Sequence, residues 1–208
     1  MSIIQKLSSS LDRRDQEPNI KLAETIVAKK DKHSVKELID NLQNKNKNIQ
    51  GDCIKTLDEI SARNPDLLSG YAGTIISLLD HKNNRMQWGA MCVLDHMTLS
   101  EPAVIYKALG KIISAADHGT VITKDHTVSI LLKFCSLKKY AAQAFPLLLD
   151  QILSAPPNQL PTYAEKALPF VTDQHKKQFL KTLSVRLDDI ETDTKRRRLE
   201  KVIQKLTK

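Results

Sequence analysis

The feature that most constrains how this chain can fold is an internal repeat of about 37 residues. The motif Leu-Asp-Glu-Ile-Ser at residues 57–61 recurs as Leu-Asp-His-Met-Thr at residues 94–98. The same step then leads to Leu131 and to Leu168, which continue the apolar register. A second register runs in step with the first, from Leu38, Ile39 and Leu42 to Ile75, Ile76 and Leu79 and on to Ile112, Ile113 and Ala116. Agreement in two registers indicates repeated structural units.

Each repeated unit has the apolar spacing of a helix. Ile54, Leu57 and Ile60 are spaced at i, i+3 and i+6, which places them on one helix face and does not fit the alternation of a strand. Short polar segments with Asn, Gly or Pro separate the helices, at residues 44–48, 81–84, 117–120 and 155–158. A single helix pair cannot cover its own apolar faces, so we expect consecutive pairs to stack around a continuous core. The predicted fold class is all-α.

The composition agrees with a helical protein. Of the 208 residues, 41% are hydrophobic and 4% are aromatic, and there are only 6 Gly and 8 Pro. This is poor material for a β-sandwich or a barrel, which needs many turns and β-rich strands. Cys53, Cys92 and Cys135 are odd in number and lie within apolar helical patterns, so we expect buried, reduced thiols.

No segment has the pattern of an export signal or of a membrane span. The first ten residues lack the apolar core that a signal peptide needs. The most apolar stretch, residues 141–153, is interrupted by Gln143, Pro146 and Asp150 and is too short to cross a bilayer. We therefore expect a soluble, cytoplasmic protein without a membrane partner.

The segment at residues 78–94 resembles a HEAT repeat across its turn. Met86, Gly89, Ala90 and Leu94 occupy the positions at which that family has an apolar residue, two small residues and a leucine. At the family's arginine position, this chain has Gln50, Gln87 and Lys124. The resemblance to HEAT/armadillo-like proteins implies a right-handed α-solenoid of antiparallel helix pairs with a period of about 37 residues. This architecture hosts many functions, so the resemblance speaks for the fold and hardly for an activity.

The resemblance covers about residues 34–190, and we expect one repeat domain over residues 1–208. An irregular pair of capping helices is expected at residues 1–33, and about four repeats at residues 34–173. Basic capping helices are expected at residues 174–208, because the terminal unit of a repeat array turns a polar face to water.

In such stacks the second helix of each pair lines the concave face, where these folds usually bind. The repeat register predicts that this stripe consists of Lys55, Glu59, Trp88, Cys92, His96, Asp125, Ser129, Lys133, Thr162 and Lys166. Members of one helix are four residues apart and so share a face. The stripe mixes both charges, which fits a protein or peptide better than a phosphate backbone. The alternative is an ordinary solvated face.

Two features of this stripe allow a sharper interpretation. Trp88 is the only tryptophan, and it is either a packing residue at a helix start or an exposed anchor for a partner. Cys92 and His96 are four residues apart and could form a thiolate–imidazole pair, but no third group or oxyanion site accompanies them. We therefore interpret Cys92 as an incidental, semi-buried thiol and predict no catalytic residue.

No motif indicates a cofactor, a metal or a small-molecule substrate. The glycines match neither the dinucleotide-binding pattern nor the P-loop, and there is no nucleophile elbow and no metalloprotease motif. Neighbouring Asp and His residues, as at Asp80-His81 and Asp117-His118, point about 100° apart on a helix and cannot chelate as a pair. We expect a chain that is not an enzyme and has no cofactor.

The net charge of +8 is concentrated near the C-terminus. Residues 174–208 contain eleven Lys or Arg and five Asp or Glu, which gives this segment a charge of +6. Such a run is usually a solvated helix face, and the alternative is a phosphate-binding patch. That patch would consist of Lys195, Arg196, Arg197, Arg198 and Lys201.

The main hypothesis is a non-enzymatic scaffold that binds a protein or peptide through its concave face. The first alternative is nucleic-acid binding, which the positive charge supports. HEAT-like alkylpurine DNA glycosylases are similar in length and fold, but no residue-by-residue match carries their catalytic residues over to this chain. The second alternative is another enzyme or an enzyme accessory, since HEAT-like proteins include lyases for tetrapyrrole attachment and regulatory subunits.

Overall fold

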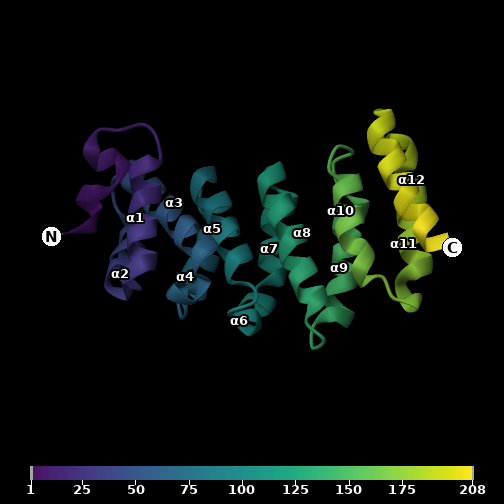
Figure 1. The fold of residues 1–208 in the computed structure, drawn as a ribbon, viewed down its shortest axis with the longest axis horizontal. Coiled ribbons are helices and arrows are strands. Elements are labelled where there is room, and N and C mark those ends of the chain that lie inside the picture. Colours follow the sequence, from purple (N-terminus) through teal and green to yellow (C-terminus); the bar gives the residue numbers. More distant parts are fainter. Residues whose placement is uncertain (1, 208) are drawn as a thin grey trace. The chain divides into compact units, whose positions relative to one another are not determined.

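The structure is a computed structural model that describes residues 2–207, and these residues form helices and no β-strand (Figure 1). The twelve α-helices are α1 (Glu17–Lys29), α2 (Lys32–Asp40), α3 (Lys47–Arg63), α4 (Ala72–Ser77), α5 (Asn84–Met97), α6 (Pro102–Lys107), α7 (Leu109–Asp117), α8 (Val121–Ser136), α9 (Ala141–Leu153), α10 (Leu160–Ala167), α11 (Asp173–Arg186) and α12 (Asp193–Thr207). Short 3-10 helices are η1 (Ile3–Lys6), η2 (Ser8–Leu11), η3 (Asn41–Gln43), η4 (Pro65–Leu68), η5 (Leu78–Asp80), η6 (Leu168–Phe170) and η7 (Leu187–Asp189). The all-α prediction is confirmed.

Two compact units divide the chain between Thr127 and Val128, within α8. In the first unit, α3 packs against α1 and α5, while α2 packs against α3 and α4 packs against α5. In the second unit, α10 packs against α9 and α12, and α11 packs against α9 and α12. The second helices α3 and α5 of two consecutive pairs are therefore in contact with each other as well as with their own partners, and so are α10 and α12. No helix within residues 2–207 is long and apolar enough to cross a membrane.

Asparagines begin two of the second helices. Asn46 and Asn83 have extended backbones, and the side chain of each accepts a hydrogen bond of 2.9 Å from the backbone N–H two residues later. These bonds satisfy amides that have no partner inside the helix, which stabilises the start of α3 and of α5. Both asparagines lie in the polar segments that the sequence indicates as breaks.

The apolar register of α3 and α5 faces the interior. Ile54, Leu57 and Ile60 on α3 are at most 1% exposed. The same face of α5 carries Met91, Leu94 and Met97, all fully buried. Burying each such side chain stabilises the fold by roughly 1.5–3 kcal/mol, so this stripe holds the first unit together.

Close packing of α3 against α5 depends on Gly89. A Cβ atom at Gly89 would lie 2.7 Å from Cγ1 of Ile54, whose branched side chain is buried. We expect Gly89→Ala to lower the free energy of unfolding by about 1.5 kcal/mol, because overpacking outweighs the better helix propensity of alanine. Urea unfolding followed by circular dichroism measures this change.

Gly51 on α3 provides the matched control. A Cβ atom there would also come within 2.7 Å of a neighbour, but the neighbour is the end of the flexible Arg85 side chain. We expect Gly51→Ala to change stability by less than about 0.5 kcal/mol. Equal effects of the two substitutions would show that contact with Ile54 does not limit the α3–α5 approach.

Candidate interaction surface

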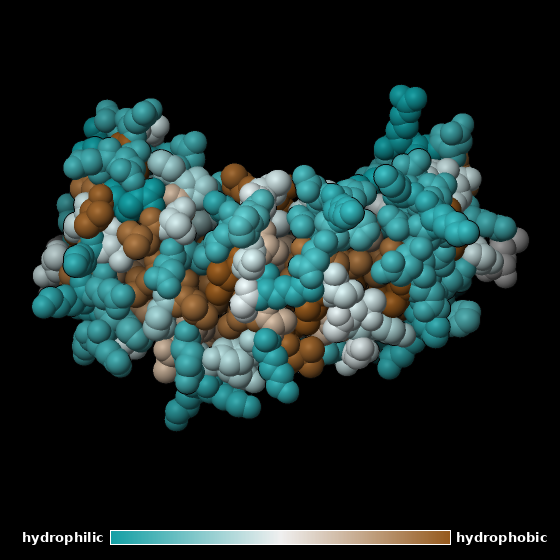
Figure 2. Space-filling model, turned by 180° about the vertical axis from the view of Figure 1, so that it is seen from behind, coloured by the Kyte–Doolittle hydropathy of each residue, from teal (hydrophilic) through white to brown (hydrophobic). Residues whose placement is uncertain are grey.

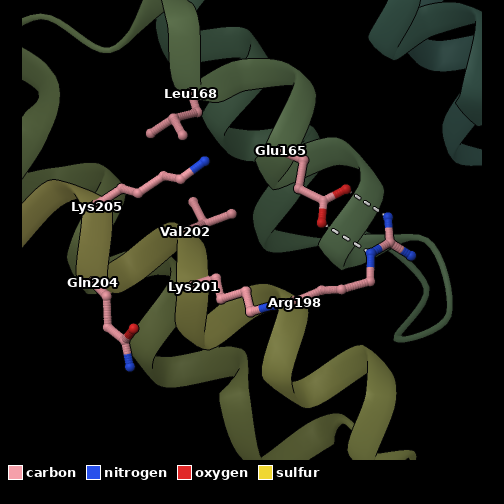
Figure 3. Close-up of a pocket in the computed structure, with 7 residues that line it drawn as sticks. All are labelled: Glu165, Leu168, Arg198, Lys201, Val202, Gln204 and Lys205. Atoms are coloured by element: carbon pink, nitrogen blue, oxygen red, sulfur yellow. Dashed lines mark hydrogen bonds and ion pairs between the residues drawn. The ribbon is translucent and has the colours of Figure 1, made fainter.

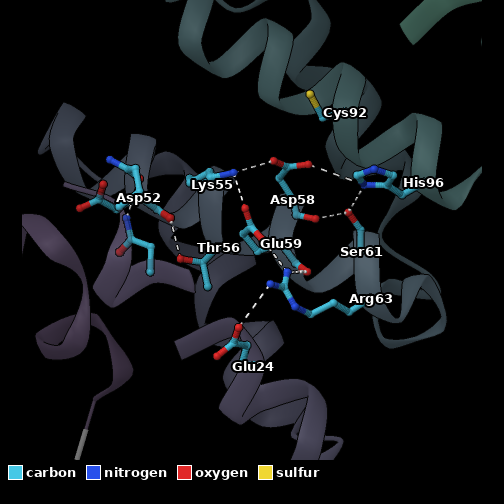
Figure 4. A network of polar contacts seen from close by, with 12 residues as sticks. Glu24, Asp52, Lys55, Thr56, Asp58, Glu59, Ser61, Arg63, Cys92 and His96 are labelled. Carbon is cyan, nitrogen blue, oxygen red and sulfur yellow. Dashed lines mark hydrogen bonds and ion pairs between the residues drawn. The ribbon is translucent and has the colours of Figure 1, made fainter. Parts of the chain in front are cut away.

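A network of charged and polar side chains connects α1, α3 and α5 in the first unit (Figure 4). At its centre, Nζ of Lys55 is 2.5 Å from Oε1 of Glu59 and 3.2 Å from Oδ2 of Asp58. All three side chains belong to α3 and are between 15% and 23% exposed, so they are reachable from solvent but held in place. The polar network, as we call it, consists of Glu24, Lys55, Asp58, Glu59, Ser61, Arg63 and His96.

The polar network extends to the helices on both sides of α3. Arg63 pairs with Glu59 and also reaches Oε1 of Glu24 on α1, at 3.5 Å. On the other side, Nδ1 of His96 on α5 is 2.9 Å from Oγ of Ser61 and 3.6 Å from Oδ1 of Asp58. Pairs of this kind contribute little to stability when exposed, so their main effect is to fix the orientation of side chains on adjacent helices.

The paired charges of the polar network are stabilised in their ionised forms. Burial disfavours ionisation of both Lys55 and Glu59, but their hydrogen bonds outweigh it. The pKa of Lys55 is raised by Glu59 and Asp58, and the pKa of Glu59 is lowered by Lys55 and Arg63. The surface therefore presents fixed charges of both signs at neutral pH.

A second polar cluster joins α5 to the first turns of α8. Nε2 of His126 is 3.1 Å from Sγ of Cys92, and Nδ1 of the same ring is 2.8 Å from Oδ2 of Asp95. Cys92 and Asp95 are each 6% exposed, whereas the His126 side chain is 25% exposed. Burial opposes protonation of His126, but the hydrogen bonds to Asp95 and Cys92 prevail and raise its pKa to about 10.

This cluster corrects the pairing considered from the sequence. Cys92 contacts His126 and not His96, whose ring is bonded to Ser61 (Figure 4). Cys92 and His96 lie one turn apart on α5, and each side chain points away from the axis of that helix. Each of them therefore meets a side chain of a neighbouring helix. All three cysteines are buried and free, as expected.

The remaining residues of the predicted stripe differ in exposure. Trp88 on α5 and Asp125 on α8 are half-buried in the first unit. In the second unit Ser129, Lys133 and Thr162 are half-buried and Lys166 is exposed. Within the first unit, the structure brings Lys55 and Glu59 together and connects them to His96 through Asp58.

Sequence reasoning missed several residues that hold these clusters together. Their contacts join positions about one repeat apart, with separations of 35 residues for Ser61 and His96 and 34 for Cys92 and His126. Pairs of polar residues separated by roughly one repeat could therefore have indicated these contacts from the sequence. The missed residues are Glu24, Asp58, Ser61, Arg63, Asp95 and His126.

The basic segment of the second unit is partly paired with its own chain. Nζ of Lys195 is 2.7 Å from Oδ1 of Asn158, and Arg196 is 3.3 Å from Asp188. Arg198 on α12 binds Glu165 of α10 through two hydrogen bonds of 2.9 and 2.6 Å, and this contact lowers the pKa of Glu165.

A groove between α10 and α12 is lined by further cationic side chains of this segment (Figure 3). It has a volume of about 380 Å³, with Leu168 and Val202 among its walls. The exposed side chains of Lys201 and Lys205 line it beside the Arg198–Glu165 pair. Arg197 is exposed as well, so the second unit has an accessible basic surface with some apolar area.

The exposed surface also offers apolar side chains. Hydrophobic residues show between hydrophilic ones on the face seen in Figure 2. Single exposed apolar residues of this kind are normal on protein surfaces. The large ones that are exposed are Leu11, Leu99, Val104, Val121, Ile122, Leu153 and Val185. Among residues 2–207, no group of three or more His, Cys, Asp or Glu is placed to hold a metal ion.

No family model matches the chain, and no curated protein matches it. Solved structures do. A designed armadillo repeat protein matches with a TM-score of 0.66 at 11% identity, over 98% of this chain and 99% of that one. An engineered protein solved by the Northeast Structural Genomics Consortium matches with a TM-score of 0.63 at 18% identity, over 99% of both chains. The chain has an armadillo-like helical-repeat fold, which confirms the resemblance at the level of the fold.

Proposed function

We propose that this chain is a non-enzymatic scaffold that binds a protein or peptide segment through the face formed by its second helices. We further propose that these helices line the concave side of a right-handed solenoid with a period of about 37 residues. The starts of α3, α5 and α8 at Lys47, Asn84 and Val121 support this period, because each is 37 residues after the one before. The armadillo-like fold supports a scaffold role, since this architecture is typically used for protein binding.

The observation that carries the proposal is the polar network across α1, α3 and α5. Lys55, Glu59 and Arg63 are reachable from solvent and already held by one another. A surface whose side chains are fixed before binding loses less conformational entropy when a partner arrives. Trp88 lies on α5 and is half-buried, and tryptophan at the centre of such a surface is a frequent binding hot spot.

The charges of this surface indicate the kind of partner. Lys55 and Arg63 are cationic, while Asp58 and Glu59 are anionic. A phosphate backbone would require a continuous row of cations, so the surface suits a polypeptide segment that carries charges of both signs. The stripe proposed for partner binding is the one predicted from the sequence, with Asp58 and Arg63 added.

The partner can be sought with a photo-crosslinking amino acid. Benzoylphenylalanine in place of Trp88 conserves an aromatic side chain on the proposed face, and the same amino acid in place of Val104 on α6 is the control. A protein that cross-links to the chain labelled at position 88, and not to the chain labelled at position 104, is then purified. Its binding to the unlabelled chain is measured directly. The same proteins at both positions, or none at position 88, would contradict the proposal.

Trp88→Ala is expected to weaken binding of that purified partner about thirtyfold, since a hot-spot tryptophan contributes about 2 kcal/mol. Because Trp88 is the only tryptophan, its fluorescence reports binding by the wild-type chain, and calorimetry compares the variants. Val104→Ala removes apolar surface from an exposed site of α6 and serves as the control. A partner that binds both variants equally well does not use the proposed face.

Nucleic-acid binding is the second candidate, and the groove between α10 and α12 is the observation that favours it. Lys201 and Lys205 line this groove, and Arg197 is exposed on the same helix. Fluorescence anisotropy of labelled DNA at low and high salt tests this candidate. Micromolar affinity that falls steeply with salt would support contact with phosphates. Absence of binding at low salt would contradict nucleic-acid binding.

A further inference from the structure

We propose that Cys92 is a reactive thiol that is modified by small disulfides, with the imidazolium of His126 as the cation that stabilises its thiolate and Asp95 as the residue that positions His126. This inference is independent of the proposed partner-binding function. It rests on three side chains of the first unit that come together from α5 and α8. The imidazole of His126 lies between the sulfur of Cys92 at 3.1 Å and the carboxylate of Asp95 at 2.8 Å.

The hydrogen bonds determine which imidazole nitrogen faces the sulfur. An ionised Asp95 can only accept, so Nδ1 of His126 donates its proton to Asp95. Nε2 carries a proton as well near neutral pH, since the contacts of His126 raise its pKa to about 10, so the cationic ring faces the sulfur and stabilises a Cys92 thiolate. This order of thiol, imidazole and carboxylate is the arrangement by which a histidine activates a cysteine nucleophile.

Solvent exposure alone would not single out Cys92. Cys92 is 6% exposed and Cys135 is 8% exposed, while Cys53 is fully buried. Burial, together with the nearby carboxylates, raises the pKa of Cys53 to about 12, and burial raises the pKa of Cys135 to about 11, so both remain thiols at neutral pH. The imidazole beside Cys92 is thus what distinguishes it, and the 25% exposed side chain of His126 provides the approach for a small reagent.

The modification is a thiol–disulfide exchange. Cys92 loses its proton to water, and the thiolate beside the imidazolium of His126 attacks one sulfur atom of the reagent. A new S–S bond forms, the S–S bond of the reagent breaks, and its electron pair leaves on the second sulfur. That second thiolate takes a proton from water. The cysteine sulfur is oxidised, the disulfide is reduced, and one small thiol is released.

The charged groups around the imidazole limit which disulfide fits. The carboxylate of Asp95 on α5 contacts the imidazole, and Lys124 and Asp125 directly precede His126 on α8. A neutral small disulfide therefore approaches more easily than an anionic one. The groups in contact with His126 are Cys92 and Asp95, and His96 follows Asp95 on α5, where its ring is paired with Asp58 of α3.

The probe is 4,4′-dithiodipyridine, a small neutral disulfide whose released thiopyridone is followed by absorbance, with the labelled cysteine identified by peptide mass spectrometry. We expect a fast phase of one equivalent on Cys92 in the folded chain. Cys92→Ser removes that phase, and His126→Gln slows it at least about tenfold, because the Cys92 thiolate loses its stabilising cation. Cys135→Ser leaves the fast phase unchanged.

The pH profile separates an activating role of His126 from a merely structural one. In the wild type we expect the rate at Cys92 to stay high as the pH falls towards neutrality. In His126→Gln and Asp95→Asn, the rate should rise with pH as for an ordinary thiol. Circular dichroism checks that each variant is folded. A wild-type Cys92 that reacts no faster than Cys135, or a rate that keeps the ordinary thiol profile in the wild type, would overturn the proposal.

Discussion

Phe179→Ala is expected to lower the free energy of unfolding by about 4 kcal/mol, the largest effect of any single substitution considered for this chain. Phe179 is fully buried, and α11 has only two other buried side chains, Thr182 and Leu183. Its ring lies 6.2 Å from that of Phe145 on α9, which is also buried. Without this ring α11 loses its aromatic contact with Phe145 of α9, and a cavity is left in the core. Urea unfolding monitored by circular dichroism gives the free energy.

Two matched variants test the reason for this loss. Phe179→Leu keeps most of the buried volume, so we expect it to cost less than about 1.5 kcal/mol. Lys181→Ala changes an exposed position of the same helix, and we expect it to cost less than about 0.5 kcal/mol. If Phe179→Ala were as mild as Lys181→Ala, α11 would be held by contacts other than this aromatic pair.

The sequence was sufficient to predict the helices and their buried face. Apolar spacing at Ile54, Leu57 and Ile60 identified residues that are buried in the structure, because burial follows the helical period. The polar segments around Asn46 and Asn83 indicated where second helices begin, because asparagine side chains can cap a helix. These are local properties, and they can be inferred without knowing how the helices pack.

The pairing of polar residues could not be predicted in the same way. Spacing of four residues suggested that Cys92 would meet His96, but Cys92 contacts His126, and His96 contacts Ser61. Which residues meet across two helices depends on the rotation and offset of each helix. Packed side-chain volumes, such as Gly89 against Ile54, set both, and a repeat of about 37 residues does not specify them.

The basic run of α12 illustrates the same limit. In the sequence, residues 195–198 form one block of four positive charges. A helix turns each successive side chain by about 100°, so the block is distributed around α12. Arg196 reaches Asp188 and Arg198 reaches Glu165, whereas Arg197 remains exposed. A count of charges therefore overstated the cations that are available to a partner.

Raising the pH from 6.5 to 10 is expected to remove stability on the order of 3 kcal/mol through His126. Its contacts with Asp95 and Cys92 overcome burial and raise its pKa from 6.5 to about 10 in the folded chain. Below pH 6.5 both states are protonated, and the stabilising contribution is complete. Between these values the unfolded state has lost the proton and the folded state retains it, so the contribution decreases as the pH rises. Urea unfolding across this range measures the decrease.

His126→Gln should flatten this dependence between pH 6.5 and 9, because its side chain does not titrate. The comparison stops at pH 9 because Cys53 and Cys135 also have raised pKa values in the folded chain. Above the ordinary thiol pKa of 9.0, these two cysteines add a further loss of stability. His118→Gln is the matched control, since the His118 ring is exposed and bonded only to the backbone oxygen of Ser114, and it should keep the wild-type dependence. A wild-type chain whose stability is constant between pH 6.5 and 9 would contradict a protonated His126 at neutral pH. A dependence that persists in His126→Gln would assign it to other groups.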